Sequence, residues 1–144
     1  MQLEAKNLGF GYHKNNWIFK QISLTIEAGE VVGLTGNSGC GKTTLAKVLA
    51  GYEVPWEGRV KLNGKAGSVS GYNPVQLIFQ HPEKSVNPRW RIRDSVNEGW
   101  QVDQELLYRL GIEESWMDRW PNELSGGELQ RFCVARALSP DTRF

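Results

Sequence analysis

A glycine-rich loop between an apolar run and an amphipathic segment constrains this chain more than any other feature. Residues 36–43 read Gly-Asn-Ser-Gly-Cys-Gly-Lys-Thr, which fits the pattern G-x-x-x-x-G-K-[ST] at every fixed position. The apolar, β-branched run at residues 30–35 predicts a buried strand before the loop. After the loop, apolar residues recur at helical spacing until Gly51, which predicts the end of a helix. The pattern therefore predicts a strand, a loop and a helix in succession.

The residue types of this loop suit it to binding phosphate groups. Its glycines let the backbone adopt conformations that a Cβ would forbid and let it approach anionic oxygens closely. The N–H groups of the loop and of the helix N-terminus can then face an anion. We expect Lys42 to reach the β- and γ-phosphates of a nucleotide and the Thr43 hydroxyl to ligate Mg²⁺. The residues expected to contact the nucleotide here are Gly36, Asn37, Ser38, Gly39, Cys40, Gly41, Lys42, Thr43 and Thr44.

A second glycine-containing motif begins a helix later in the chain. Ser125 with Glu128 three residues on predicts a capping box, in which the two side chains bond the first free N–H groups of a helix. Between them, Gly126 and Gly127 disfavour a helix but leave backbone N–H groups open to a phosphate. The helix is predicted to run through residue 138, with a buried face that comprises Leu129, Phe132, Cys133 and Ala137.

Together, the two motifs resemble those of the ATP-binding cassette (ABC) ATPases. The signature sequence of that family is LSGGQ followed by a helix that carries Gln-Arg, and this chain has LSGGE at residues 124–128 followed by Gln130 and Arg131. Glu128 is the departure, because the family most often has Gln there, and it adds a negative charge near the site. The resemblance covers essentially all 144 residues.

This resemblance implies an α/β fold: a P-loop NTPase core with an N-terminal antiparallel β portion and an inserted α-helical subdomain. Residues 1–90 are expected to form the nucleotide-binding core, residues 91–138 the helical subdomain ending in the signature helix, and residues 139–144 the start of the return to the core. Besides the strand before the loop, strands are expected at 3–10, 18–26, 59–62 and 75–79. Helices are expected at 95–100 and at 104–110, the latter ending at Gly111.

The resemblance also implies roles for individual residues. Tyr12 matches the aromatic residue that stacks on adenine, and packing at a strand end is the structural alternative. Gln80, after the apolar run, matches the glutamine that touches Mg²⁺ and the attacking water, whereas simple strand termination is its alternative. Lys42 and Gln80 are the catalytic candidates, and Thr43 and Gln80 are the metal ligands. Residues 125–128 are implied to bind the γ-phosphate held by an opposite protomer. ATP and Mg²⁺ are the implied cofactors.

In the family, the signature helix leads into a strand that ends in Asp-Glu, the Walker B motif. Its Asp helps to hold Mg²⁺, and its Glu polarises the attacking water. The sequence stops at residues 139–144, where that strand is expected to begin, and neither His13 nor His81 matches the switch histidine of the family. The chain is therefore interpreted as an N-terminal portion of a longer ATPase, truncated before the Walker B strand and expected to be inactive by itself.

Residues 80–90 resemble the corresponding segment in the ATPases of peptide, nickel and metallophore importers, through Gln-His-Pro and Ser-Val-Asn-Pro-Arg. The resemblance implies a peripheral subunit on the cytoplasmic side of the cell membrane, bound to permease subunits. It also implies head-to-tail pairing with a second ABC ATPase subunit. The alternative is an ABC-type ATPase that acts on ribosomes or DNA. The DNA-acting class separates its two motifs by long coiled coils, and this chain has no sustained heptads.

Composition limits the functions further. The net charge of +1 gives no basic stripe, so no nucleic-acid partner is expected. No apolar run approaches the roughly twenty residues that span a bilayer, and the N-terminus lacks the apolar core of a signal peptide. The two cysteines, Cys40 and Cys133, do not make a disulfide framework and suit a reducing compartment.

Overall fold

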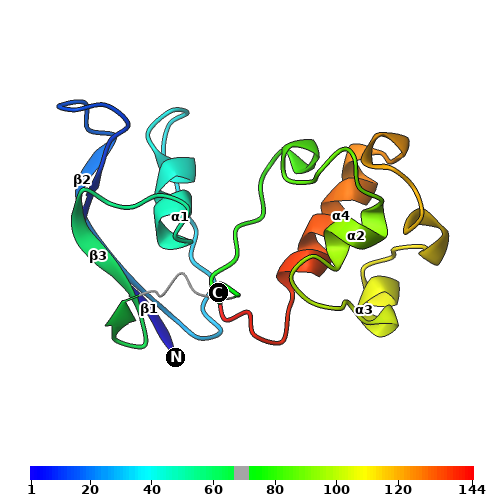
Figure 1. The fold of residues 1–144 in the computed structure, drawn as a ribbon. Helices are drawn as coiled ribbons and strands as arrows, with labels where there is room; N and C mark the ends of the chain where they lie inside the picture. The colour runs from blue at the N-terminus through cyan, green and yellow to red at the C-terminus, as the bar shows by residue number, and fades with distance from the viewer. Residues whose placement is uncertain (67–71) are drawn as a thin grey trace. The chain divides into compact units, whose positions relative to one another are not determined.

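The computed structural model describes residues 1–66 and 72–144, which divide into two compact units. The first unit contains Met1–Leu77 together with Arg143–Phe144, and the second contains Ile78–Thr142. Figure 1 shows the strands and α1 in the first unit and α2, α3 and α4 in the second. Of the helices that the structure describes, none is both long enough and apolar enough to cross a membrane.

An antiparallel sheet forms most of the first unit. Its strands lie in the order β2-β1-β3-β4, and every pair is antiparallel. The strands are β1 (Gln2–Phe10), β2 (Phe19–Glu27), β3 (Glu57–Leu62) and β4 (Lys65–Ala66). The first three confirm the strands predicted at 3–10, 18–26 and 59–62. The short β4 was not predicted, although Asn63-Gly64 between β3 and β4 is the residue pair most typical of a two-residue hairpin, and both residues have positive φ.

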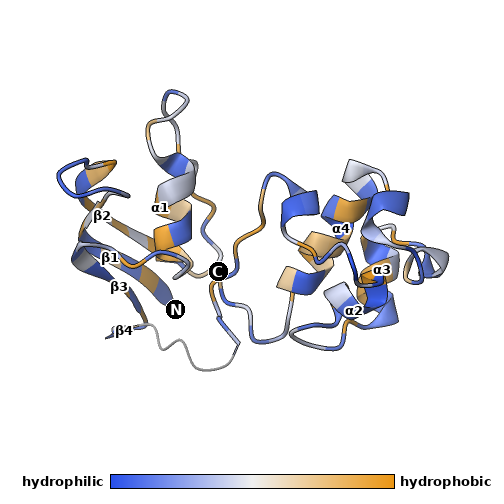
Figure 2. Cartoon of the chain, turned by 45° about the horizontal axis from the view of Figure 1, so that its top comes forward, coloured by the Kyte–Doolittle hydropathy of each residue, from blue (hydrophilic) through white to orange (hydrophobic). Residues whose placement is uncertain are grey.

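Helix α1 (Lys42–Leu49) packs against this sheet. Leu45 and Val48 are buried on its inner side, in one cluster with Leu8 and Phe10 of β1. Figure 2 shows apolar and polar residues mixed along α1 and the strands, as expected when one side of each faces a core. The predicted end of the helix is confirmed, because Gly51 has a φ of 76° directly after the last turn.

The second unit is helical. It contains α2 (Ile92–Val96), α3 (Gln104–Arg109), α4 (Gly126–Ala137) and the 3₁₀ turns η1 (Pro82–Lys84), η2 (Glu114–Trp116) and η3 (Pro121–Glu123). The helices share one buried cluster, whose members include Ile92, Val96, Leu107, Trp116, Leu129 and Phe132. Asp103 caps α3 by accepting a 2.7 Å hydrogen bond from the Leu106 N–H, and Gly111 follows its end with a φ of 64°. The helix predicted at 104–110 is thereby confirmed.

The helix predicted at 95–100 is placed wrongly. Helix α2 begins three residues earlier, at Ile92, and ends at Val96. Side-chain hydrogen bonds hold the following residues in a turn instead. The Val102 N–H donates to Asn97 Oδ1 at 3.0 Å, and Trp100 Nε1 donates to the Arg136 carbonyl at 2.9 Å. Such bonds offer the backbone an alternative to helix formation.

Two predicted strands do not form. Residues 30–35 are irregular and exposed, and Val31 is 97% exposed. The backbone groups of residues 31–35 make no hydrogen bond to any described residue, so no ladder defines a strand there. Residues 75–79 are irregular as well. Their start is paired through Gln76 N–H to the Phe144 carbonyl at 2.8 Å, and Arg143 N–H donates to the Pro74 carbonyl at 2.7 Å.

Candidate functional site

The glycine-rich loop ends in a left-handed residue that starts α1. Gly41 has a φ of 96° and is the N-cap of α1, with no side chain to bond the first helical N–H groups. A Cβ on Gly41 would lie 2.6 Å from Ile18 Cγ2, so glycine is required here both by conformation and by space. The first N–H groups of α1 have no partner within the helix, and they are therefore available to an anion.

The ammonium group of Lys42 lies within this loop. Its Nζ donates to the Gly36 carbonyl at 2.7 Å and to the Asn37 carbonyl at 2.8 Å, and it lies 3.8 Å from Cys40 Sγ. The loop residues 31–40 are exposed throughout. A cation is therefore held at the centre of an open, glycine-rich loop, where an anionic ligand can exchange with two neutral carbonyl oxygens.

Tyr12 and Thr44 lie close together in the first unit. The Tyr12 hydroxyl is 3.5 Å from Thr44 Oγ1, and its half-exposed ring meets Phe10 edge to face with centroids 5.1 Å apart. The sheet thereby places an aromatic ring beside the first turn of α1. Thr43, on the same turn, is exposed, and its hydroxyl has no hydrogen-bond partner among the described residues.

Sequence reasoning missed an aromatic cluster that adjoins Tyr12. Phe10 contacts Trp56 with centroids 6.2 Å apart, and Trp56 meets Trp17 edge to face at 5.1 Å. Gly9 and Gly11 make this packing possible, because a Cβ would lie 2.7 Å from Trp17 Cζ3 at Gly9 and 3.0 Å from Trp56 Cη2 at Gly11. The sequence signal that could have indicated this cluster is the alternation of glycine and aromatic residues at positions 9–12.

The second motif has the predicted capping box. The Glu128 N–H donates to Ser125 Oγ at 3.3 Å, and the Ser125 N–H donates to the Glu128 carboxylate at 2.7 Å. The predicted buried face of α4 is confirmed, and Ala135 is also buried. Gly126 and Gly127 are exposed, and beyond its own helix backbone and chain neighbours a Cβ built on either would have no atom of a described residue within 4 Å. The fold of this unit therefore does not require glycine at these two positions.

We predict a pH step at this capping box. The backbone N–H of Ser125, followed by its hydroxyl, lowers the pKa of Glu128 below its ordinary value of 4.5. A carboxyl with a lowered folded-state pKa stabilises the helix start above its ordinary pKa, and that contribution is lost as the pH falls through the lower, folded-state value. The amide resonance of Ser125 should therefore shift in NMR spectra below pH 4.5, and Glu128→Gln should remove the shift. An unchanged shift in Glu128→Gln would assign it to another group.

Gln80 lies in the same unit as the second motif. It is exposed, two residues before η1, and Gln130 Nε2 of α4 is 3.5 Å from the carbonyl of the preceding Phe79. Tyr12 and the loop at 36–44 belong to the first unit. The structure thus gathers the predicted site residues into two groups.

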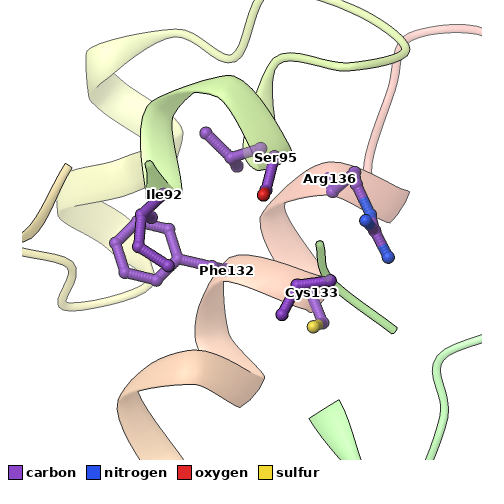
Figure 3. A pocket seen from close by; sticks show the side chains of 7 residues that line it. Ile92, Ser95, Phe132, Cys133 and Arg136 are labelled. Carbon is purple, nitrogen blue, oxygen red and sulfur yellow. The ribbon is translucent and has the colours of Figure 1, made fainter. Parts of the chain in front are cut away.

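A cavity between α2 and α4 does not suit a nucleotide. Its volume is about 10 Å³, whereas pockets for small-molecule ligands measure roughly 300–1,000 Å³. Ile92, Ser95 and Phe132 are among its lining residues (Figure 3). It has room for a single water molecule at most.

Comparison with known proteins places the chain in a family. The family model described as "ABC transporter" matches residues 19–144. The chain is 38% identical, over 98% of its length, to the nickel import system ATP-binding protein NikE of Staphylococcus aureus, strains N315 and Mu50 among others. The chain spans 63% of the length of these relatives.

Solved structures agree on the fold. The dimeric structure of MJ0796, a bacterial ABC transporter cassette, matches with a TM-score of 0.76 at 23% identity. The match covers 97% of this chain and 70% of the MJ0796 chain. The structure of cbiO1 from Clostridium perfringens, part of the ABC transporter complex cbiONQ, matches with a TM-score of 0.68 at 24% identity. The match covers 93% of this chain and 59% of the cbiO1 chain. At this identity the likeness concerns the fold alone. The predicted P-loop NTPase class is confirmed, and this chain belongs to the ABC transporter family.

Proposed function

We propose that this chain is part of the ATP-binding, ATP-hydrolysing subunit that energises an ABC importer for nickel, metal-chelate complexes or peptides. The observation that carries the proposal is the placement of the Lys42 ammonium inside the glycine-rich loop at the start of α1. The similarity to nickel import ATP-binding proteins supports an importer over an ATPase that acts on ribosomes or DNA.

The loop residues bind the triphosphate in this proposal. Lys42 exchanges the carbonyls of Gly36 and Asn37 for β- and γ-phosphate oxygens, because a charge-assisted bond to phosphate is stronger than one to a neutral carbonyl. N–H groups of the loop and of the first turn of α1 face the same oxygens. The nucleobase stacks on the exposed ring of Tyr12.

Mg²⁺ fits the oxygen donors of the site. The exposed Thr43 hydroxyl, which no described residue engages, is the proposed ligand in the first unit, and the exposed Gln80 amide oxygen is the proposed ligand in the second. When bound, the ion neutralises negative charge on the β- and γ-phosphates. Lys42 and Gln80 orient the phosphate and the attacking water, respectively. The domain boundaries expected at residues 90 and 138 stay predictions.

The proposed partners are a second ABC ATPase subunit and membrane permease subunits. Ser125, Gly126, Gly127 and Glu128 complete the site of the opposite protomer, which the open space above both glycines supports. The subunit then lies at the cytoplasmic face of the membrane through its permease. The test is uptake of radioactive nickel, of a radioactive metal-chelate complex and of a labelled oligopeptide by cells with and without the gene. Equal uptake of all three in the two kinds of cell would refute the importer assignment.

A thiol reagent should report nucleotide binding at the loop. Cys40 is exposed, whereas Cys133 is only 5% exposed. We predict that iodoacetamide labels the native full-length protein at Cys40 and not at Cys133, and that MgATP slows the labelling, because bound phosphate occupies the loop around Cys40. Peptide mapping by mass spectrometry measures both rates, and Cys40→Ser is the control. Equal labelling of Cys40 with and without MgATP would contradict phosphate binding here.

A further inference from the structure

Helix α4 holds the neighbouring turn η1 through side chains spaced three residues apart. Cys133 Sγ lies 3.2 Å from Ser85 Oγ, and Arg136 Nη2 donates to the Ser85 carbonyl at 2.9 Å. One turn earlier, Gln130 Nε2 is 3.5 Å from the Phe79 carbonyl. Residues at this spacing lie on one side of a helix. The helix therefore has a polar side that faces residues 79–85.

The turn that these side chains hold is itself well bonded. The Lys84 N–H donates to the His81 carbonyl at 3.1 Å, and the Ser85 N–H and hydroxyl both donate to the Pro82 carbonyl, at 3.0 and 2.9 Å. Pro82 is buried. Fixing Ser85 therefore fixes the whole turn from residue 81 onward. Gln80 is the residue directly before that turn.

Arg136 connects α4 both to η1 and to the turn at residues 98–100. Besides bonding Ser85, its guanidinium lies 3.6 Å from the Glu98 carboxylate, and its carbonyl accepts from Trp100 Nε1. Its side chain is 26% exposed, so these bonds are partly shielded from water. Figure 3 shows Arg136 and Cys133 on α4, with Ser95 on the facing α2. Ser95 Oγ is buried without a partner among the described residues, so it contributes no comparable bond.

We propose that Arg136 is a positioning residue, which holds Gln80 at a fixed place relative to the signature motif at the opposite end of α4. The inference rests on the proposed function, since it assigns Gln80 a role in hydrolysis. The physical link is the helix itself. Its twelve residues form a continuous hydrogen-bonded rod, with Ser125 at its first end and Arg136 in its last turn. A displacement of η1 is therefore transmitted to Ser125 and Gly126 along one rigid element.

We call the hydrogen bond from Arg136 to the Ser85 carbonyl the clamp. Hydrogen exchange in the nucleotide-free, full-length protein tests the clamp without reference to activity. Arg136→Ala should raise exchange of the Lys84 and Ser85 amides about tenfold, because a charge-assisted hydrogen bond to the turn is lost. Arg131→Ala is the matched control. Arg131 makes the same kind of bond on the same helix, from Nη1 to the Gly111 carbonyl at 2.8 Å, so its loss should raise exchange near Gly111 and not in η1. Unchanged exchange in η1 of Arg136→Ala would overturn the inference.

Kinetics test whether the clamp serves hydrolysis. Arg136→Ala should lower kcat about tenfold and leave the KM for ATP within about twofold, because Lys42 and Tyr12, which are proposed to bind the triphosphate and the base, lie in the other unit. Arg136→Lys should recover part of kcat. If Arg136→Ala does not fold, Arg136→Met replaces it, since it keeps the aliphatic part of the side chain and removes the guanidinium that donates to the Ser85 carbonyl. A raised KM with unchanged kcat overturns the proposed role. A wild-type protein without ATPase activity refutes the proposed function instead, and the exchange experiment still tests the clamp.

Discussion

Replacing Lys42 with alanine should weaken ATP binding to the full-length protein about ten- to a hundredfold and remove hydrolysis. The ammonium group lies within hydrogen-bond distance of two loop carbonyls and is the cation that the loop offers to phosphate. A hydrogen bond to a charged group contributes about 1.5–3 kcal/mol, and about 1.4 kcal/mol corresponds to a factor of ten in affinity. Isothermal titration calorimetry with a non-hydrolysable ATP analogue measures the change.

Lys47→Ala is the matched control for this experiment. Lys47 lies in the last turn of the same helix α1, away from the loop. Its replacement by alanine removes the same charge as Lys42→Ala does. Its ATP affinity should equal that of the wild type. Equal losses in both variants would indicate a general electrostatic effect, and an unchanged Lys42→Ala would remove the loop from the nucleotide site.

Replacing Gly126 with alanine should abolish hydrolysis while ATP affinity and folding stability are retained. Outside its own helix backbone and chain neighbours, no atom in the described part of the chain lies within 4 Å of a Cβ built at this position. Gly126 begins α4, and alanine is a better helix former than glycine by up to about 1 kcal/mol. Stability should therefore stay equal or rise. Hydrolysis should fall because, in the proposed head-to-tail dimer, the added methyl group would meet the γ-phosphate held by the opposite protomer. Thermal unfolding and steady-state ATPase assays measure the two effects.

A mixing experiment separates an action between subunits from an action within one chain. In the proposed dimer, Lys42→Ala and Gly126→Ala would damage different halves of each site. In a homodimer, an equimolar mixture should regain part of the activity, because half of the sites in the mixed dimers contain an intact loop and an intact signature motif. No recovery, together with lost ATP affinity in Gly126→Ala itself, would indicate that both motifs act within one chain.

Local signals in the sequence predicted the elements that need no distant partner. The capping box of Ser125 and Glu128 and the buried face of α4 form as expected, because both depend on residues a few positions apart. Gly51 and Gly111 end their helices for the same reason. The strands β1, β2 and β3 were also predictable, since apolar residues alternate or cluster in each of them. Their backbone pairing with one another is complete within the first 62 residues.

The two predicted strands that do not form show the limit of such signals. Residues 30–35 have strand-like composition, but a strand exists only where neighbouring backbones complete its hydrogen bonds, and Val31 is almost fully exposed. Residues 75–79 likewise form no strand, although the Gln76 N–H donates to the Phe144 carbonyl. The clamp between Arg136 and Ser85 was equally invisible in the sequence, because no spacing rule connects positions 51 residues apart.

A crystal structure of the full-length protein with Mg²⁺ and a non-hydrolysable ATP analogue tests the central claim most directly. We predict that Lys42 Nζ leaves the carbonyls of Gly36 and Asn37 and lies within hydrogen-bond distance of the β- and γ-phosphates, with the base on Tyr12. Ser125 and Gly126 of a second subunit should contact the γ-phosphate. A nucleotide bound elsewhere, with Lys42 still on the two carbonyls, would contradict the account.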